Sequence, residues 1–130
     1  MLQDLRGSKA EELKSRGLKL AVVTDAYNGH AIARLQKTKL LHYFDVIVSV
    51  DMTGKKKPEP DSIKLALDRL GVNPKEAIIV GDSVERDIQA GKKLGMITVY
   101  AAYGDRNFFE EKGNEADFVV NCISELLEVL

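Results

Sequence analysis

Five short apolar runs alternate with segments of helical periodicity along this chain, and this alternation constrains the fold more than any other feature. Strands that alternate with helices of about 10–15 residues indicate βαβ units, whose strands run parallel and are joined by right-handed crossovers. The sequence therefore predicts an α/β fold with a doubly wound parallel sheet, a Rossmann-like three-layer α/β/α arrangement. We expect strands at 18–23, 44–49, 77–80, 96–100 and 116–120, and helices at 4–16, 30–41, 61–70, 84–94 and 123–130.

Residues with special backbone preferences mark several of the expected helix ends. Gly17 and Gly71 follow two of these helices, where a glycine in the left-handed conformation is a common C-terminal cap. Asp61 stands at the start of the helix that Gly71 closes, and we expect its carboxylate to cap that helix.

The composition excludes functions that need a strongly charged or membrane-spanning chain. There are 19 lysines and arginines against 20 aspartates and glutamates, which leaves a formal net charge of −1. No excess of positive charge is available for nucleic acid or an anionic membrane. The single cysteine, Cys122, cannot form an internal disulfide, and no apolar run approaches the roughly 20 residues of a membrane span. We expect one domain over 1–130, in the cytoplasm, with neither a nucleic-acid nor a membrane partner.

Polar side chains follow three of the expected strands, at the edge where open α/β sheets bind their ligands. Thr24 and Asp25 end the first strand, and a hydroxyl together with the backbone N–H groups of the next turn can hold phosphate oxygens. Lys57 precedes a stiff Pro-Glu-Pro segment, which presents its ammonium group at a defined place to neutralise an anion. Asp82 and Asp87 follow the third strand, and paired carboxylates there suit Mg²⁺.

Each of these features has a simpler explanation when it is taken alone. A threonine at a strand end is commonly a turn former. Lys57 follows Lys55 and Lys56, so it could belong to a solvated basic loop. Asp82 could cap the following helix, with Asp87 a solvated acidic residue. The three features occur together after successive strands, and together they indicate a site for phosphate and Mg²⁺.

Three motifs of this chain resemble those of the haloacid dehalogenase superfamily of hydrolases, most of which are phosphatases. Residues 22–25 (Val-Val-Thr-Asp) resemble its second motif, 57–60 (Lys-Pro-Glu-Pro) its third, and 80–87 (Val-Gly-Asp-Ser-Val-Glu-Arg-Asp) its fourth. The resemblance runs from about residue 5 to the C-terminus. It implies that the threonine binds the phosphoryl group, that the lysine stabilises the nucleophile and the transferred phosphoryl, and that the two aspartates of 80–87 hold Mg²⁺.

The first motif of that family, an apolar strand ending in Asp-x-Asp-Gly-Thr, is not found in the sequence. Its first aspartate is the nucleophile that forms an aspartyl-phosphate, and its second is the general acid and base. Asp51 follows a strand, but we reject it as a nucleophile because it lacks the second aspartate and falls in the loop that leads to Lys57. The resemblance therefore implies a Mg²⁺-dependent phosphatase of small phosphorylated metabolites in the complete form, and a truncated core domain that is inactive or very weak by itself.

In the family, the strand of the first motif lies between the strands at 18–23 and 77–80. Without it, each half of the sheet would expose an unpaired inner edge. The two strands could pair directly, a second chain could donate a strand in a homodimer, or the sequence could be a fragment of a longer protein.

Three other functions stay open from the sequence. The chain could be a non-catalytic module that binds metal or phosphate or serves in assembly. A phospho-receiver domain has a similar length and sheet, but it needs acidic residues after its first strand and a lysine after its last. A haloacid dehalogenase is a minority alternative. His30 and His42 lack metal-ligand spacing, and we expect both on helix surfaces.

Overall fold

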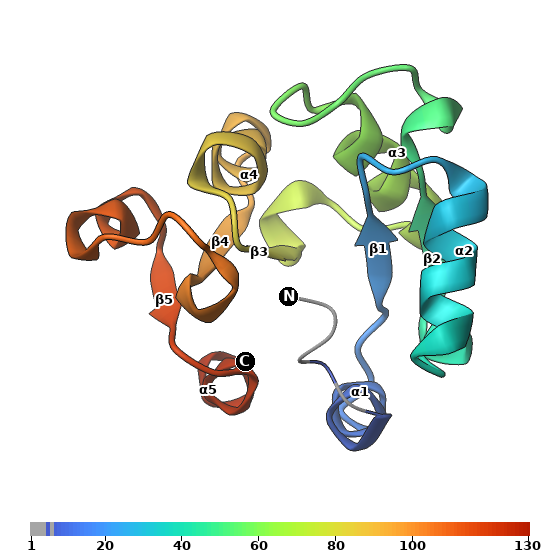
Figure 1. Cartoon of the computed structure of the whole chain (residues 1–130), viewed down its shortest axis with the longest axis horizontal. Helices are drawn as coiled ribbons and strands as arrows, with labels where there is room; N and C mark the ends of the chain where they lie inside the picture. Colours follow the sequence, from blue (N-terminus) through green and yellow to red (C-terminus); the bar gives the residue numbers. More distant parts are fainter. Residues whose placement is uncertain (1–4, 6) are drawn as a thin grey trace.

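Strands and helices alternate along the part of the chain that the computed structural model describes, residue 5 and residues 7–130 (Figure 1). Positions 4 and 6 of the first expected helix lie outside this part. The strands are β1 (Ala21–Val23), β2 (Val46–Val48), β3 (Ile78–Gly81), β4 (Ile97–Ala101) and β5 (Phe118–Val120). The helices are α1 (Gly7–Ser15), α2 (Asn28–Lys37), α3 (Asp61–Leu70), α4 (Gln89–Leu94) and α5 (Ile123–Val129).

All strand pairings are parallel, but the strands form two sheets instead of one. β1 pairs with β2, with Val22 opposite Ile47. The second sheet has the order β3-β4-β5, and Val80 lies opposite Val99. Within the described part of the chain β1 and β3 are not paired, so the two strands do not close up directly. The predicted α/β fold is confirmed, whereas the sheet is divided at the predicted gap.

Helices cover both faces of the two sheets, which gives the predicted three layers. On one face, α1 and α2 pack on β1 through Ala10, Val22 and Leu35. On the same face, Arg16 after α1 donates a hydrogen bond to the carbonyl of Leu127 in α5 at 2.8 Å, and α5 covers β4 and β5. α3 and α4 cover the opposite face.

The apolar cluster under α3 and α4 holds the two sheets together. Ile63 and Leu67 of α3 and Ala90 of α4 form its buried centre together with Met96. Partly buried side chains from both sheets pack on this centre, Val23 from β1 and Ile79 from β3 among them. The helices therefore connect the sheets where hydrogen bonds between strands do not.

A cleft of about 470 Å³ lies between the two sheets. Its walls are mainly apolar side chains of β1, β3 and the helices on both faces, and Lys57 and Asp87 are among its lining residues. The cleft lies at the place where the sequence predicts a missing strand.

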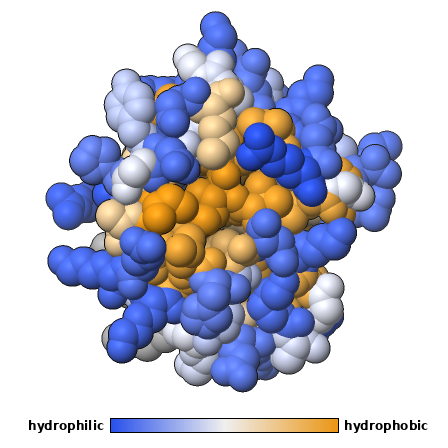
Figure 2. Space-filling model, turned by 90° about the vertical axis from the view of Figure 1, so that its right-hand side faces the viewer, coloured by the Kyte–Doolittle hydropathy of each residue, from blue (hydrophilic) through white to orange (hydrophobic). Residues whose placement is uncertain are grey.

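A second apolar region is visible in Figure 2 as a band across the side of the molecule that carries α2, α3 and β2, framed by polar residues.

Several elements begin or end elsewhere than the sequence predicts. The first strand is shorter than 18–23, because the chain joins β2 only from Ala21 onwards. The expected helix at 84–94 has a π-helical first part, Val84–Ile88, in which the N–H of Ile88 donates to the carbonyl of Ser83 five residues back. Asp61 is the first residue of α3 and its side chain caps nothing, so that prediction is wrong. None of the described helices is long and apolar enough to cross a membrane.

Candidate active site

Lys57 is the centre of the candidate site. Its Nζ donates to the carbonyl oxygen of Val23 at the end of β1, at 3.1 Å, and forms a 2.6 Å ion pair with Oδ1 of Asp87. The two side chains of the pair are only 13% and 11% exposed. Lys57 therefore connects the carboxyl end of one sheet to the helical turn that follows β3 in the other.

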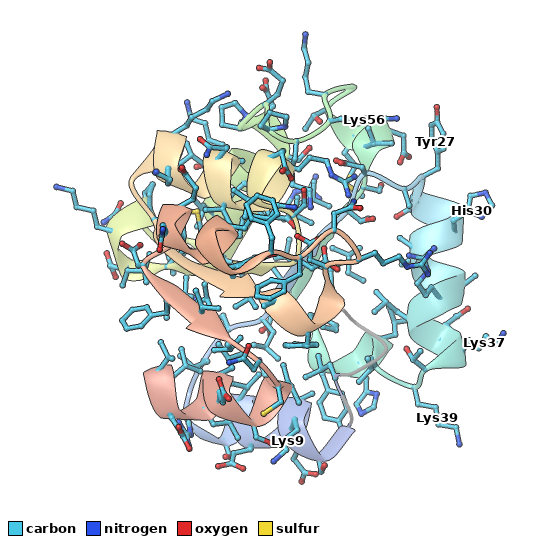
Figure 3. The ribbon with its side chains drawn as sticks, turned by 60° about the vertical axis from the view of Figure 1, so that its left-hand side comes forward. Lys9, Tyr27, His30, Lys37, Lys39 and Lys56 are labelled. Carbon is cyan, nitrogen blue, oxygen red and sulfur yellow. The ribbon has the colours of Figure 1, made fainter. Side chains whose placement is uncertain are left out.

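The neighbouring lysines have different surroundings. Lys55 and Lys56 are exposed, and Figure 3 shows Lys56 at the outer surface of the loop. The solvated-loop explanation thus applies to these two residues and not to Lys57.

Thr24 and Asp25 lie next to Lys57 at the end of β1. The hydroxyl of Thr24 accepts a hydrogen bond from the N–H of Ala26 at 3.1 Å, which closes a tight turn. The carboxylate of Asp25 accepts the backbone N–H of Lys57 at 3.1 Å and lies 3.5 Å from Nη1 of Arg86. The Asp25 side chain therefore holds the loop that contains Lys57. The predicted contact between Asp25 and phosphate would have to come from the backbone N–H of Asp25.

Asp87 is buried and held on three sides. Besides the ion pair with Lys57, its Oδ2 accepts the N–H of Ser83 at 3.3 Å. Its side chain also lies directly on Gly81, where an added Cβ would come within 2.3 Å of the carboxylate. Only glycine at this position leaves room for Asp87, which explains the glycine before Asp82 in the fourth motif.

The helix cap after β3 is Ser83 and not Asp82. The hydroxyl of Ser83 accepts the N–H of Arg86 at 3.2 Å, as an N-cap residue does. The capping explanation for Asp82 is therefore wrong. Asp82 is partly exposed at the end of β3 and packs against Gly104 in the loop after β4.

The side chains of Asp82 and Asp87 are of the chemical type that binds Mg²⁺ at phosphate-handling sites. Mg²⁺ is commonly bound by one or two carboxylates together with water and substrate phosphate, and less often by a full set of protein ligands. Asp82 and Asp87 supply two carboxylates of this kind. No group of three or more His, Cys, Asp or Glu residues that could hold a metal occurs in the described part of the chain. The ligand assignment of Asp82 and Asp87 stays a prediction.

A buried polar network beside this edge is a feature that sequence reasoning missed. Tyr100, at the end of β4, is fully buried, and its hydroxyl donates to Oδ2 of Asp105 at 2.5 Å. Lys112 donates to the same oxygen at 2.9 Å. Tyr100, Asp105 and Lys112 lie on a strand end, a loop and a 3₁₀ turn. Their spacing in the sequence therefore matches no motif that could have predicted the network.

The hydrogen bonds of this network favour a charged Asp105, a charged Lys112 and a neutral Tyr100. Burial by itself would raise the pKa of Asp105, but the hydrogen bonds from Tyr100 and Lys112 hold it below its ordinary value. The hydrogen bond to Asp105 raises the pKa of Lys112. Burial and the neighbouring carboxylate raise the pKa of Tyr100, so the phenol stays a neutral donor.

Asp51 and the two histidines lie outside the candidate site. Oδ1 of Asp51 accepts the N–H of Asn28 at 2.9 Å and so caps α2. His30 lies on α2 and His42 on a 3₁₀ turn, both exposed as expected, and Figure 3 shows His30 pointing away from the protein.

Residues 8–101, which include all three motifs, match the model of the haloacid dehalogenase-like hydrolase family. The chain belongs to this family. It is 38% identical over 120 residues to the phosphoglycolate phosphatase of Aquifex aeolicus, covering 92% of this chain and 54% of that protein. It is 34% identical over 119 residues to the glyceraldehyde 3-phosphate phosphatase of Methanocaldococcus jannaschii, covering 92% of this chain and 52% of that protein.

A solved structure of this haloacid dehalogenase-like family has the same arrangement of elements. The crystal structure of a phosphatase from Thermococcus onnurineus matches with a TM-score of 0.83 and 35% identity, over 95% of this chain and 55% of that one. The chain thus spans about half the length of the curated relatives it matches. Phosphatases of the family are its homologues, and it carries part of their fold.

Proposed function

We propose that this chain is the part of a haloacid dehalogenase-like phosphatase that binds the phosphoryl group and Mg²⁺, and that the complete protein hydrolyses a small phosphate monoester. The observation that carries the proposal is the position of Lys57. Its Nζ lies between the carbonyl of Val23 and the carboxylate of Asp87, at the carboxyl ends of β1 and β3. The relatives named for phosphoglycolate and glyceraldehyde 3-phosphate act on small phosphorylated metabolites, which supports the same class of substrate here.

In this proposal, different residues of the chain bind the phosphoryl group and Mg²⁺. In the proposed site, the hydroxyl of Thr24 and the backbone N–H groups of its turn hold phosphoryl oxygens. Lys57 neutralises the negative charge that the phosphoryl group carries in the transition state. Asp82 and Asp87 hold Mg²⁺, which when bound supplies charge stabilisation to the phosphoryl oxygens. The nucleophilic carboxylate of an aspartyl-phosphate mechanism, and the acid that protonates the leaving oxygen, would come from a strand in the cleft.

We expect this chain alone to have little or no phosphatase activity. The nucleophile is one of the groups that supply the acceleration of roughly 10⁶-fold or more typical of enzymes. The test is hydrolysis of p-nitrophenyl phosphate with Mg²⁺ by the purified chain, compared with an Asp82→Ala variant. Rapid turnover that disappears in Asp82→Ala would contradict this expectation, because the site would then be complete.

A synthetic peptide that supplies the missing strand tests the same proposal by restoring activity. An apolar peptide ending in Asp-x-Asp-Gly-Thr should enter the cleft beside β1 and β3, raise the thermal stability of the chain and restore some hydrolysis. A matched peptide ending in Asn-x-Asn-Gly-Thr should bind and stabilise equally but restore no hydrolysis. Stabilisation by neither peptide would contradict the proposed role of the cleft.

The second candidate function is a non-catalytic assembly module. It is favoured by the edges of β1 and β3 with which no strand of the described residues pairs. Such edges can pair with a strand of another chain. A homodimer formed by strand exchange would fill both clefts. Size-exclusion chromatography with light scattering distinguishes the two cases, since a monomer across the micromolar range argues against strand exchange.

A further inference from the structure

The buried network around Asp105 fixes the loop that follows β4. Asp105 accepts hydrogen bonds from Tyr100 at 2.5 Å, from Lys112 at 2.9 Å and, through its other oxygen, from the N–H of Asn107 at 2.9 Å. Lys112 also donates to the carbonyl of Asn107 at 3.3 Å. The side chains of Asp105 and Lys112 are each 8% exposed. A charge-assisted pair with so little access to water holds its loop in one geometry.

The fixed loop lies directly against Asp82. Gly104, the residue before Asp105, ends the 3₁₀ turn Ala102–Gly104. A Cβ added to Gly104 would lie 2.8 Å from Oδ2 of Asp82 and 3.0 Å from its Cβ. Any movement of Gly104 toward β3 would therefore push the Asp82 carboxylate.

The network also reaches the chain that follows Asp82. Nζ of Lys112 lies 3.5 Å from Oε1 of Glu85, three residues after Asp82. Asp82, Glu85, Gly104 and Lys112 all line one solvent-open recess of about 510 Å³. The network thus contacts both the loop that contains Gly104 and the segment of chain that carries Asp82.

We propose that Tyr100, Asp105 and Lys112 are positioning residues, which set the orientation of the Asp82 carboxylate by holding Gly104 beside it. In this role they act on Asp82 through Gly104. The expected consequence of this positioning is a change in the affinity of the site for a divalent cation. This consequence rests on the proposed function. Partners that orient a metal ligand change metal affinity by about 10–100-fold when they are removed.

The test uses two kinds of variant, each with a matched control. Gly104→Ala places a methyl group against Asp82, whereas Gly29→Ala, with nothing within 4 Å of the added Cβ, is its control. Lys112→Met removes the buried ammonium, whereas Lys92→Met removes the exposed partner of Glu115, at 3.2 Å, and is its control. Tyr100→Phe keeps the ring and removes only the hydroxyl, which provides a milder variant if Lys112→Met does not fold.

Three measurements are made on the whole chain: the ¹³C carboxyl NMR signal of Asp82, the affinity for Mn²⁺, and the midpoint of thermal unfolding. The Asp82 signal is assigned with Asp82→Asn. We expect Gly104→Ala and Lys112→Met to shift this signal and to weaken Mn²⁺ binding about tenfold or more, while both controls leave the two readouts unchanged.

The possible results separate this inference from the proposed function. Variants that lower only the unfolding midpoint, with an unchanged Asp82 signal, would overturn the inference, because the network would then be merely structural. An Asp82 signal that moves in a chain with no Mn²⁺ affinity would uphold the positioning role and overturn the proposed metal site. Loss of Mn²⁺ binding in Lys92→Met to the same extent as in Lys112→Met would also overturn the inference.

Discussion

Lys56 and Lys57 are adjacent and chemically identical, yet only one of them lies in the candidate site. Lys56 is exposed, whereas Lys57 contacts Val23 at the end of β1 and Asp87 in the helical turn that follows β3. The following proline made Lys57 the better candidate from the sequence, because proline fixes the backbone next to it. Its role as the connection between the sheets depends on these two partners, which lie 34 and 30 residues away in the chain.

Replacing Lys57 by methionine should destabilise the protein far more than the same change at Lys56. Lys57→Met leaves the buried carboxylate of Asp87 without its cation, which costs about 3 kcal/mol, the lower end of the range for breaking a buried pair. Lys56→Met, at an exposed position, should change the free energy of unfolding by less than about 0.5 kcal/mol. Urea unfolding of both variants provides the measurement.

A double variant controls for the lost packing of the lysine chain. Lys57→Met combined with Asp87→Asn should be less destabilising than the sum of the single changes, because the amide no longer leaves a buried charge. Additive effects would mean that the ion pair contributes nothing to stability.

Asp45 should make the stability of the protein sensitive to acid. The hydrogen bond from Lys14, at 2.6 Å, and that from the N–H of Leu20 hold the pKa of Asp45 below its model-peptide value of 3.8. The stabilisation is therefore complete above the unfolded pKa and is lost as the pH falls through the folded pKa. Unfolding midpoints between about pH 7 and pH 3 should fall less steeply for Asp45→Asn than for the wild-type protein.

The control for this acid dependence is Asp68→Asn, at an exposed position on α3. It should follow the wild-type curve. A curve for Asp45→Asn that parallels the wild-type curve through the acid range would contradict the assignment.

At the scale of the elements, α4 lies unusually close to the sheet. A Cβ added to Gly91 would come within 2.5 Å of Cγ2 of Ile79 and 3.0 Å of Cγ2 of Thr98, from β3 and β4. The helix can approach the two strands only because position 91 has no side chain. Gly91, which follows the fourth motif, therefore serves the packing of α4 on the sheet.

Gly91→Ala should destabilise the protein although alanine is the better helix former. Overpacking of a tight interior contact costs about 1–3 kcal/mol, against a gain of about 1 kcal/mol in helix propensity, so the expected net effect is destabilising. Gly29→Ala in α2, where the new methyl group meets nothing within 4 Å, should be neutral or stabilising. The free energy of unfolding of both variants measures the difference, and a stabilised Gly91→Ala variant would contradict the packing argument.

The order and type of the elements could be predicted from the sequence, but some of their local geometry could not. Apolar periodicity placed the strands and helices because burial of one face repeats at the period of each element. The π-helical part at Val84–Ile88 had no such signal. There, the carboxylate of Asp87 is fixed by Lys57 and Ser83, which are contacts of the folded chain.

At the scale of the whole molecule, the divided sheet should be visible in the exchange of amide hydrogens. β4 is paired on both sides, whereas β1 and β3 each have one edge along the cleft that no strand in the described part of the chain covers. Amides of β4 should exchange slowest, and those of β1 and β3 that face the cleft should exchange markedly faster.

Hydrogen exchange followed by NMR on the purified chain measures this difference. Equal protection on both edges of β1 and β3 would mean that a second strand, from this chain or another, covers them in solution. Measurement at two protein concentrations distinguishes these cases, because only a dimer depends on concentration.

The sequence by itself determined the parallel α/β fold, the place of the gap, and the candidate residues Thr24, Lys57 and Asp82. These follow from local patterns: the period of burial, turn chemistry, and polar side chains directly after strands. Only the tertiary structure decided that the sheets stay apart around a cleft, that Ser83 is the helix cap, and that a network around Asp105 borders Asp82. Each of these depends on which distant groups meet in the folded chain, and burial patterns along a sequence carry no record of such partners.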